Sequence, residues 1–187
     1  MRKGITDALG MCAVLAVLIG FFSLKSPNFL TATNFTALAN QIPAAVLVAV
    51  GMTYVLITAG IDLSVGSLVG LSGAVLGICL DRFGMPLPLA IILGLAGGLL
   101  AGMVNGLVTV RWALPPFIVT LGMLEVGRGA TFLLTDTRTI YLGSKIGGLA
   151  SMAVGNISML FILAILIVIA AQLVLDRTSF GRHLIAI

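Results

Sequence analysis

The sequence predicts an all-α integral membrane protein, a polytopic helical bundle with about six spans and a broken helix near residues 60–66. Composition is the first reason: 60% of the 187 residues are hydrophobic and 9% are charged, whereas an ordinary soluble domain is about 25% charged. So few polar residues cannot cover a soluble surface, and lipid removes the need for one. The second reason is length, because several apolar runs approach the roughly 20 residues that cross a bilayer as a helix.

Charged or turn residues separate most of the expected spans. They occur at Lys25-Ser26-Pro27, at Asp81-Arg82, at Arg111 and at Asp176-Arg177. No small-x-small cleavage motif follows the first apolar run, so we expect an uncleaved span there and not a signal peptide. The six expected spans cover about residues 8–24, 42–59, 65–80, 87–110, 117–134 and 157–175.

The connections hold most of the remaining polar residues. We expect Asn34 to cap a helical piece that starts at Phe35, and residues 135–156 to form a long, glycine-rich loop. Arg2 and Lys3 favour a cytoplasmic N-terminus, because basic residues gather on the cytoplasmic side of a membrane. That orientation places five basic residues inside and four outside, which is a narrow margin.

The net charge of +4 does not indicate a nucleic-acid partner. Apart from the adjacent Arg2 and Lys3, the basic residues are scattered singly and form no stripe, which excludes nucleic-acid binding. Cys12 and Cys79 lie inside apolar runs, without a His or a second Cys at short spacing, so we expect neither a disulfide nor a metal site. The sequence also lacks a combination of acid, base and nucleophile, so we expect no catalytic residues.

Glycines recur on two of the expected spans. Such residues weaken a helix in water, but in lipid they open a groove that lets another backbone approach closely. The pattern therefore predicts packing helices of a bundle, with glycines that line a moving gate as the alternative. The two stripes are Gly66, Gly70, Gly73 and Gly77, and Gly94, Gly98, Gly102 and Gly106.

Residues 60–67 place an aspartate between two apolar runs with almost no polar loop around it. Either two helices turn here or one helix breaks at membrane depth, and such breaks require surrounding protein or a water-filled cavity. Asp62 or Ser64 is expected to cap the helix that starts near Val65. The segment is thus either a structural cap or a polar lining of a translocation path.

Glu125 and Arg128 share one face of an expected span at i, i+3 spacing. Ionised groups inside a span are costly unless they are paired. The simplest interpretation is that the two side chains pair with each other and face the interior of the bundle. The alternatives are a role in solute passage and an Arg128 side chain that snorkels to the interface.

The segment Gly60-Ile61-Asp62-Leu63-Ser64-Val65-Gly66-Ser67 resembles the signature of permeases in the ribose, xylose and galactose ABC importer family. Three further stretches follow in that family's order and are similar to it, which makes the resemblance specific. They are Asn105-Gly106, the run from Pro115 to Gly122 with Arg128-Gly129, and Thr178-Ser179-Phe180-Gly181-Arg182-His183.

The resemblance implies that residues 1–187 form the N-terminal part of one transmembrane permease domain in the bacterial cytoplasmic (inner) membrane. It implies a second permease subunit in a homo- or heterodimer, and a periplasmic or secreted sugar-binding protein. It also implies cytoplasmic ATP-binding subunits, which bind the ATP and Mg; no cofactor is expected in this chain, whose sequence has no G-x-x-x-x-G-K-[ST] phosphate loop.

The resemblance further implies that residues 176–187 begin an ATPase-docking segment, with Ser179, Gly181 and Arg182 as contacts, and that the chain is truncated there. Asp62, Ser64, Asn105, Glu125 and Arg128 are the expected residues of the substrate path. A monosaccharide is the expected substrate, with its identity left open. A secondary carrier or channel and a non-transporting membrane anchor are the competing interpretations.

Overall fold

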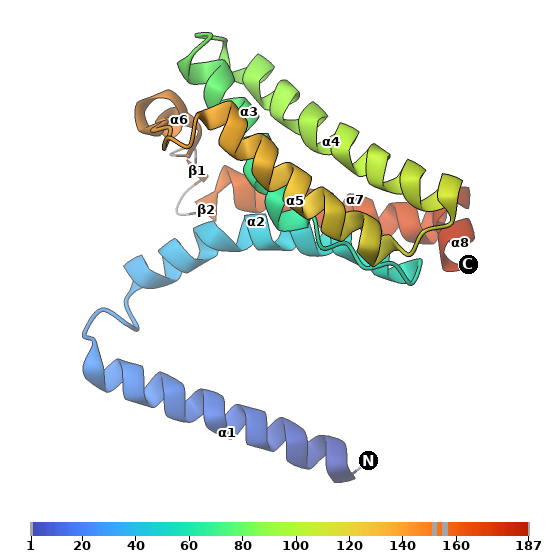
Figure 1. Ribbon diagram of the computed structural model, residues 1–187. Helices are drawn as coiled ribbons and strands as arrows, with labels where there is room; N and C mark the ends of the chain where they lie inside the picture. Colours follow the sequence, from blue (N-terminus) through green and yellow to red (C-terminus); the bar gives the residue numbers. More distant parts are fainter. Residues whose placement is uncertain (1, 151–152, 155–156, 187) are drawn as a thin grey trace.

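The computed structural model describes residues 2–150, 153–154 and 157–186, which form a predominantly helical chain (Figure 1). The predicted all-α class is confirmed. Two strands of two residues each pair antiparallel, Ala153 with Ser158. The elements in chain order are α1 (Arg2–Lys25), α2 (Ala32–Ile57), α3 (Val65–Asp81), α4 (Leu87–Trp112), α5 (Pro116–Thr135), α6 (Gly143–Ala150), β1 (Ala153–Val154), β2 (Ile157–Ser158), α7 (Met159–Arg177) and α8 (Ser179–Ile185).

Among the described residues, α2, α4, α5 and α7 are long and apolar enough to cross a membrane. The Gly10–Lys25 part of α1 and the whole of α3 are shorter apolar helices. Many large apolar side chains on these helices are exposed, as expected where lipid and not water is the solvent. The chain is therefore a polytopic helical membrane protein. The exact boundaries of the six expected spans stay a prediction.

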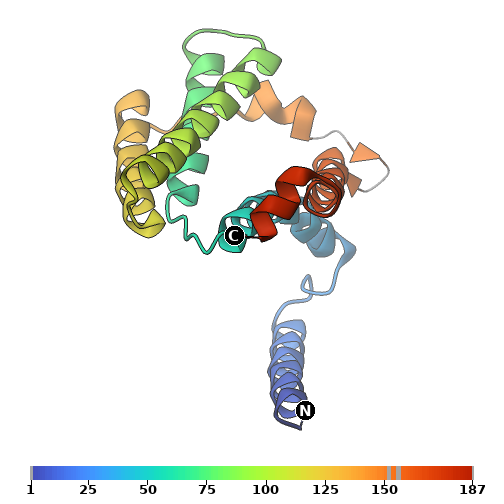
Figure 2. The same ribbon diagram turned by 90° about the vertical axis from the view of Figure 1, so that its right-hand side faces the viewer.

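The helices pack in two groups, which Figure 2 shows from the side. In one group α3 lies against both α4 and α5; in the other, α2 runs along α7, and α8 packs against α7 and α2. Residues 58–64 connect the groups, as does the segment that carries α6 and the strands. Helix α1 projects away from both groups (Figures 1 and 2).

The expected loop over residues 135–156 contains helix α6, which the sequence analysis missed. This helix covers the turn between α3 and α4, where Ile146 packs against a small core of Cys79, Leu80 and Ala90. Lys145 Nζ donates to Leu80 O at 3.0 Å and to Asp81 Oδ1 at 2.9 Å. Lysine capping of the last carbonyls of α3 therefore anchors the segment that was expected to be irregular.

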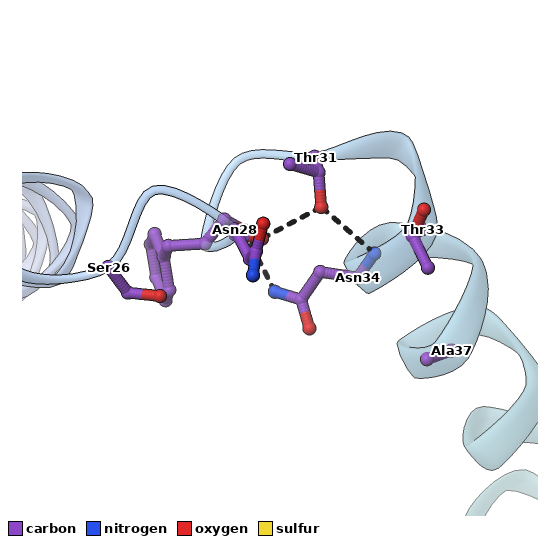
Figure 3. Close-up of a pocket in the computed structure, with 7 residues that line it drawn as sticks. Ser26, Asn28, Thr31, Thr33, Asn34 and Ala37 are labelled. Carbon is purple, nitrogen blue, oxygen red and sulfur yellow. Dashed lines mark hydrogen bonds between the residues drawn. The ribbon is translucent and has the colours of Figure 1, made fainter.

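The start of α2 also differs from the expectation. The helix begins at Ala32, and Thr31 is its N-cap: the Thr31 hydroxyl accepts from Asn34 N–H at 3.4 Å. The Asn34 side chain instead donates to Phe29 O at 2.8 Å, while Figure 3 shows the Thr31 hydroxyl next to the Asn34 backbone nitrogen. The prediction that Asn34 caps a helix at Phe35 is wrong, because a hydroxyl three residues earlier fills that role. Helix α2 then continues through Pro43 without interruption.

Candidate functional site

The connection between α2 and α3 is the place where the predicted break occurs. Helix α2 ends with Ala59 in the left-handed region, at φ 54°. Ala59 N–H donates to Leu56 O at 2.9 Å and Gly60 N–H donates to Val55 O at 3.0 Å, which together form a Schellman motif. Gly60 is buried, and a Cβ there would lie 3.1 Å from Val55 Cγ1. Because α2 and α3 then join different helical groups, the chain turns between two helices.

A chain of side-chain hydrogen bonds joins this connection to α4. Asn105 Nδ2 donates to Ser64 Oγ at 3.0 Å, and the Ser64 hydroxyl donates to Asp62 Oδ1 at 2.6 Å. Asp62 Oδ1 also accepts from Ser64 N–H at 2.8 Å. Ser64 is fully buried and Asn105 is buried. Three residues that the sequence analysis proposed for the substrate path therefore lie together.

The capping roles are divided differently from the expectation. Ser64 occupies the N-cap position of α3, but its side chain makes no capping hydrogen bond to the helix. The predicted Ser64 cap is wrong, because the hydroxyl is engaged between Asp62 and Asn105. Asp62 instead accepts from the backbone N–H of Ser64, one of the four donors at a helix start that lack a helical acceptor.

The sequence analysis missed Thr120, which ties the same connection to α5. Its hydroxyl accepts from Leu63 N–H at 3.1 Å and lies 3.2 Å from Ile61 O, to which it donates. Thr120 is buried. Its place in the motif from Pro115 to Gly122 was the available signal, but 57 residues separate Thr120 from Leu63 and spacing alone does not predict that contact.

A cavity of about 550 Å³ lies beside these polar residues. Asp62, Asn105 and Thr120 form part of its wall, and Phe180 and Leu184 of α8 form another part. The cavity therefore lies between the two helical groups and is bounded by the connection, α4, α5 and α8. Its remaining lining residues are Tyr54, Val55, Thr58, Gly60, Ile61, Gly102, Gly106, Thr109, Val110 and Pro116.

Glu125 and Arg128 lie elsewhere, near the middle of α5. Arg128 Nη1 and Glu125 Oε1 are 3.4 Å apart, so the predicted pair forms. The two side chains are 64% and 67% exposed, and the expectation that they face the interior of the bundle is wrong for this chain. Arg128 borders a separate hollow of about 350 Å³ between α3 and α5, whose wall includes Gly66 and Gly70.

The residues proposed for docking lie on α8, which follows α7 after one residue. The Thr178 hydroxyl caps α8 by accepting from Gly181 N–H at 3.1 Å. Gly181 is buried, and a Cβ at this position would lie 2.2 Å from Leu175 O. Ser179 and Arg182 are exposed, and Arg182 Nη2 donates to Ser179 Oγ at 3.1 Å. Gly181 thus has a packing role, while Ser179 and Arg182 form a surface.

The comparisons with known proteins agree with these observations. A family model described as the permease component of branched-chain amino acid transport systems matches residues 34–187. The fructose import permease protein of Rhizobium meliloti is 33% identical over 190 residues, which cover 96% of this chain and 52% of that protein. The ribose import permease protein of Bacillus subtilis is 37% identical over 193 residues, covering 98% of this chain and 58% of the relative.

The xylose transport system permease protein of Escherichia coli K12 is 40% identical over 130 residues, which cover 70% of this chain and 33% of that protein. The chain spans about half the length of most of these relatives. No solved structure matches it. The resemblance to sugar importer permeases is confirmed, and the chain belongs to the family of permease components of branched-chain amino acid transport systems, in which its named relatives are sugar permeases.

Proposed function

We propose that this chain is a membrane-spanning permease subunit of an ATP-driven monosaccharide importer and forms part of its translocation path. One observation carries the proposal: buried polar side chains meet at the non-helical connection 58–64, beside a cavity. Non-helical backbone at membrane depth is tolerated where it is buried in protein or lines a water-filled cavity, and transporters place solute sites at such breaks. The names of the sugar permease relatives supply the substrate class.

The proposed path contains both sets of polar residues. Asp62 and Asn105 line the cavity, and the fully buried Ser64 joins them through its hydroxyl group. Glu125 and Arg128 lie on an exposed face of α5, where an ion pair that faced lipid would be costly. That face therefore meets water in the path or a second permease subunit.

The proposed orientation places the N-terminus and α8 in the cytoplasm. Because α2, α4 and α7 run in the same direction (Figure 1), Arg111, Arg177 and Arg182 lie at one end of the bundle. At the opposite end two basic residues are paired with acids, Arg82 with Asp136 and Lys145 with Asp81. The end with Arg111, Arg177 and Arg182 fits the positive-inside rule.

The proposed partners follow from this orientation. Cytoplasmic ATP-binding subunits bind the ATP and Mg and dock on residues 176–187, through Ser179 and Arg182, with Gly181 holding α8 in place. A periplasmic or secreted sugar-binding protein delivers the substrate from the other side, in the bacterial inner membrane. A second permease subunit, identical or different, completes the translocation path.

Uptake into sealed vesicles tests the function. The chain is reconstituted with the ATP-binding subunits and the sugar-binding protein of its importer, and entry of radiolabelled D-ribose, D-xylose and D-fructose is measured. We expect uptake of at least one sugar that requires ATP and the binding protein. Uptake driven by a proton or sodium gradient without ATP would instead show a secondary carrier, and its absence under every condition would support a membrane anchor.

A further inference from the structure

The C-terminal end of α3 is the most continuously buried part of the described chain. Residues 77–80 are all buried, and no other run of four described residues is. The segment 136–146, which follows α5 and includes the start of α6, covers this end of α3 together with α4 (Figure 1). This segment is called the strap.

Apolar side chains of the strap lie directly on the end of α3. Ile140 Cδ1 is 3.4 Å from the position that a Cβ would take at Gly77. Leu142 and Ile146 pack against the small core that contains Cys79, which is 6% exposed. The three strap side chains are themselves only half-buried, so the apolar contribution to holding the strap is moderate.

Two ion pairs fasten the strap near its two ends. Asp136 pairs with Arg82, which directly follows α3, and Lys145 Nζ lies 2.9 Å from Asp81 Oδ1. The four side chains are between 39% and 61% exposed. Ion pairs with this exposure contribute little each and are weakened by salt. The electrostatic fastening of the strap is therefore reversible.

The strap begins with two consecutive residues in the left-handed region, Asp136 at φ 49° and Thr137 at φ 56°. Aspartate tolerates this conformation, but a β-branched threonine is strained there. Such strain persists where surrounding contacts hold the backbone in place. Because the neighbouring Asp136–Arg82 pair is one of those contacts, its loss lets the backbone relax at residues 136–137.

We propose that the strap is a releasable latch, closed in this structure, which opens about residues 136–137 when its two ion pairs break and thereby uncovers Cys79. The strap belongs to one of the two connections between the helical groups; the other is residues 58–64. Opening lengthens that connection, so the two groups can separate at this end while α3, α4 and α5 stay packed together. The proposal concerns the mechanics of the fold and does not depend on the solute or the partners of the importer.

Maleimide labelling of Cys79 in the full chain, held in lipid nanodiscs, tests the latch. In a Cys12→Ala background Cys79 is the one remaining thiol, and the neutral reagent N-ethylmaleimide reports how often the strap uncovers it. The variant Arg82→Gln with Lys145→Met removes both ion pairs. Arg138→Gln is the matched control, because Arg138 is an exposed arginine of the strap that belongs to neither pair.

We expect removal of both ion pairs to speed the labelling of Cys79 by about three- to tenfold, in line with the small contribution of exposed pairs, and Arg138→Gln to leave the rate unchanged. Thr137→Asn should slow labelling, because asparagine adopts the left-handed conformation more readily than threonine and so stabilises the closed strap. Raising KCl from roughly 0.1 M to 1 M should speed labelling of the parent chain but not of the variant without the pairs, because salt screens them.

A second thiol separates local opening from general unfolding. Ala164 is 3% exposed on α7, in the other helical group. Ala164→Cys, in a chain without the two native cysteines, should keep its labelling rate when the ion pairs are removed. Acceleration at both positions would show loosening of the whole chain and would overturn the latch. Equal rates at Cys79 with and without the ion pairs, or an equal acceleration by Arg138→Gln, would also overturn it.

Discussion

At the scale of single residues, Thr120 holds the connection 58–64 against α5 through its hydroxyl group. Thr120→Val keeps the shape of the side chain but leaves Leu63 N–H without its acceptor. That hydrogen bond is only partly buried, and Leu63 itself is 43% exposed, so we expect the free energy of unfolding to fall by about 0.5–1.5 kcal/mol, the net contribution of one hydrogen bond. Unfolding by SDS in mixed micelles, followed by the fluorescence of Trp112, measures the change.

Thr53→Val is the matched control for this substitution. The Thr53 hydroxyl is exposed and bonds only to Ala49 O of its own helix, at 2.8 Å. Its loss should change stability by less than about 0.5 kcal/mol, as is usual for surface substitutions. Equal effects of the two substitutions would contradict the role assigned to Thr120.

The types of residue in the sequence were enough to predict part of the polar cluster at the connection 58–64. Asp62 and Ser64 stood out because polar residues are rare between apolar runs, and the structure does place them at a helix start. The Ser64–Asn105 contact, across 41 residues, depends on how α3 crosses α4, which local patterns do not encode. Thr120 was missed for the same reason, since threonine in a helix ordinarily bonds to the carbonyl one turn earlier.

At the scale of elements, the glycine stripe of α4 makes contact along only part of its length. A Cβ at Gly94 would lie 2.9 Å from Ser72 O, a backbone atom of α3, whereas Gly102 has open space around it. We expect Gly94→Ala to destabilise the chain by about 1–3 kcal/mol through overpacking. Gly102→Ala should be neutral or stabilising by up to about 1 kcal/mol, because alanine favours the helix.

Thermal unfolding of the two variants in detergent gives this comparison, with the exposed Gly129→Ala of α5 as a second open-space control. A Gly102→Ala variant as unstable as Gly94→Ala would show that α4 packs along its whole stripe. The periodicity predicted a packing face correctly at Gly94 and Gly98 of α4. It was wrong for most of the α3 stripe, where Gly66, Gly70 and Gly73 have no atom within 4 Å of a Cβ position. It could not predict that Gly102 and Gly106 leave the contact, because that depends on the crossing of α3 and α4.

Within α8, Gly181 packs against α7, whereas Ser179 and Arg182 form the proposed docking surface. Arg182 is exposed at the proposed docking surface, and Arg138 is an exposed arginine at the opposite end of the bundle. We expect Arg182→Ala to reduce co-purification of the ATP-binding subunit several-fold, and Arg138→Ala to leave it unchanged. Gly181→Ala is unsuitable for this test, because its Cβ would overlap the α7 backbone and displace α8. Unchanged co-purification with Arg182→Ala would place docking elsewhere.

At the scale of the whole molecule, the two helical groups meet at the cavity, and its lining residues come from both. The sequence predicted the helices from apolar length and the turn from residues 60–67. It could not predict the division into groups, because α2 is paired with α7 and not with its neighbour α3. Helix α2 also begins ten residues before the expected span, since residues 32–41, which mix polar with apolar side chains, continue the helix outside the long apolar run.

The orientation of the chain across the membrane depends on all of its spans together, and cysteine labelling tests it. In a Cys12→Ala background, Ser179→Cys places a thiol on α8 and Thr139→Cys places one on the connection after α5; both positions are exposed, whereas Cys79 is buried. A membrane-impermeant maleimide should label Thr139→Cys in intact cells and Ser179→Cys only after permeabilisation. The reverse pattern would put α8 outside, away from any cytoplasmic ATPase. Labelling at both sites in intact cells would mean that the segment between them does not cross the membrane, although α7 is long and apolar enough to do so.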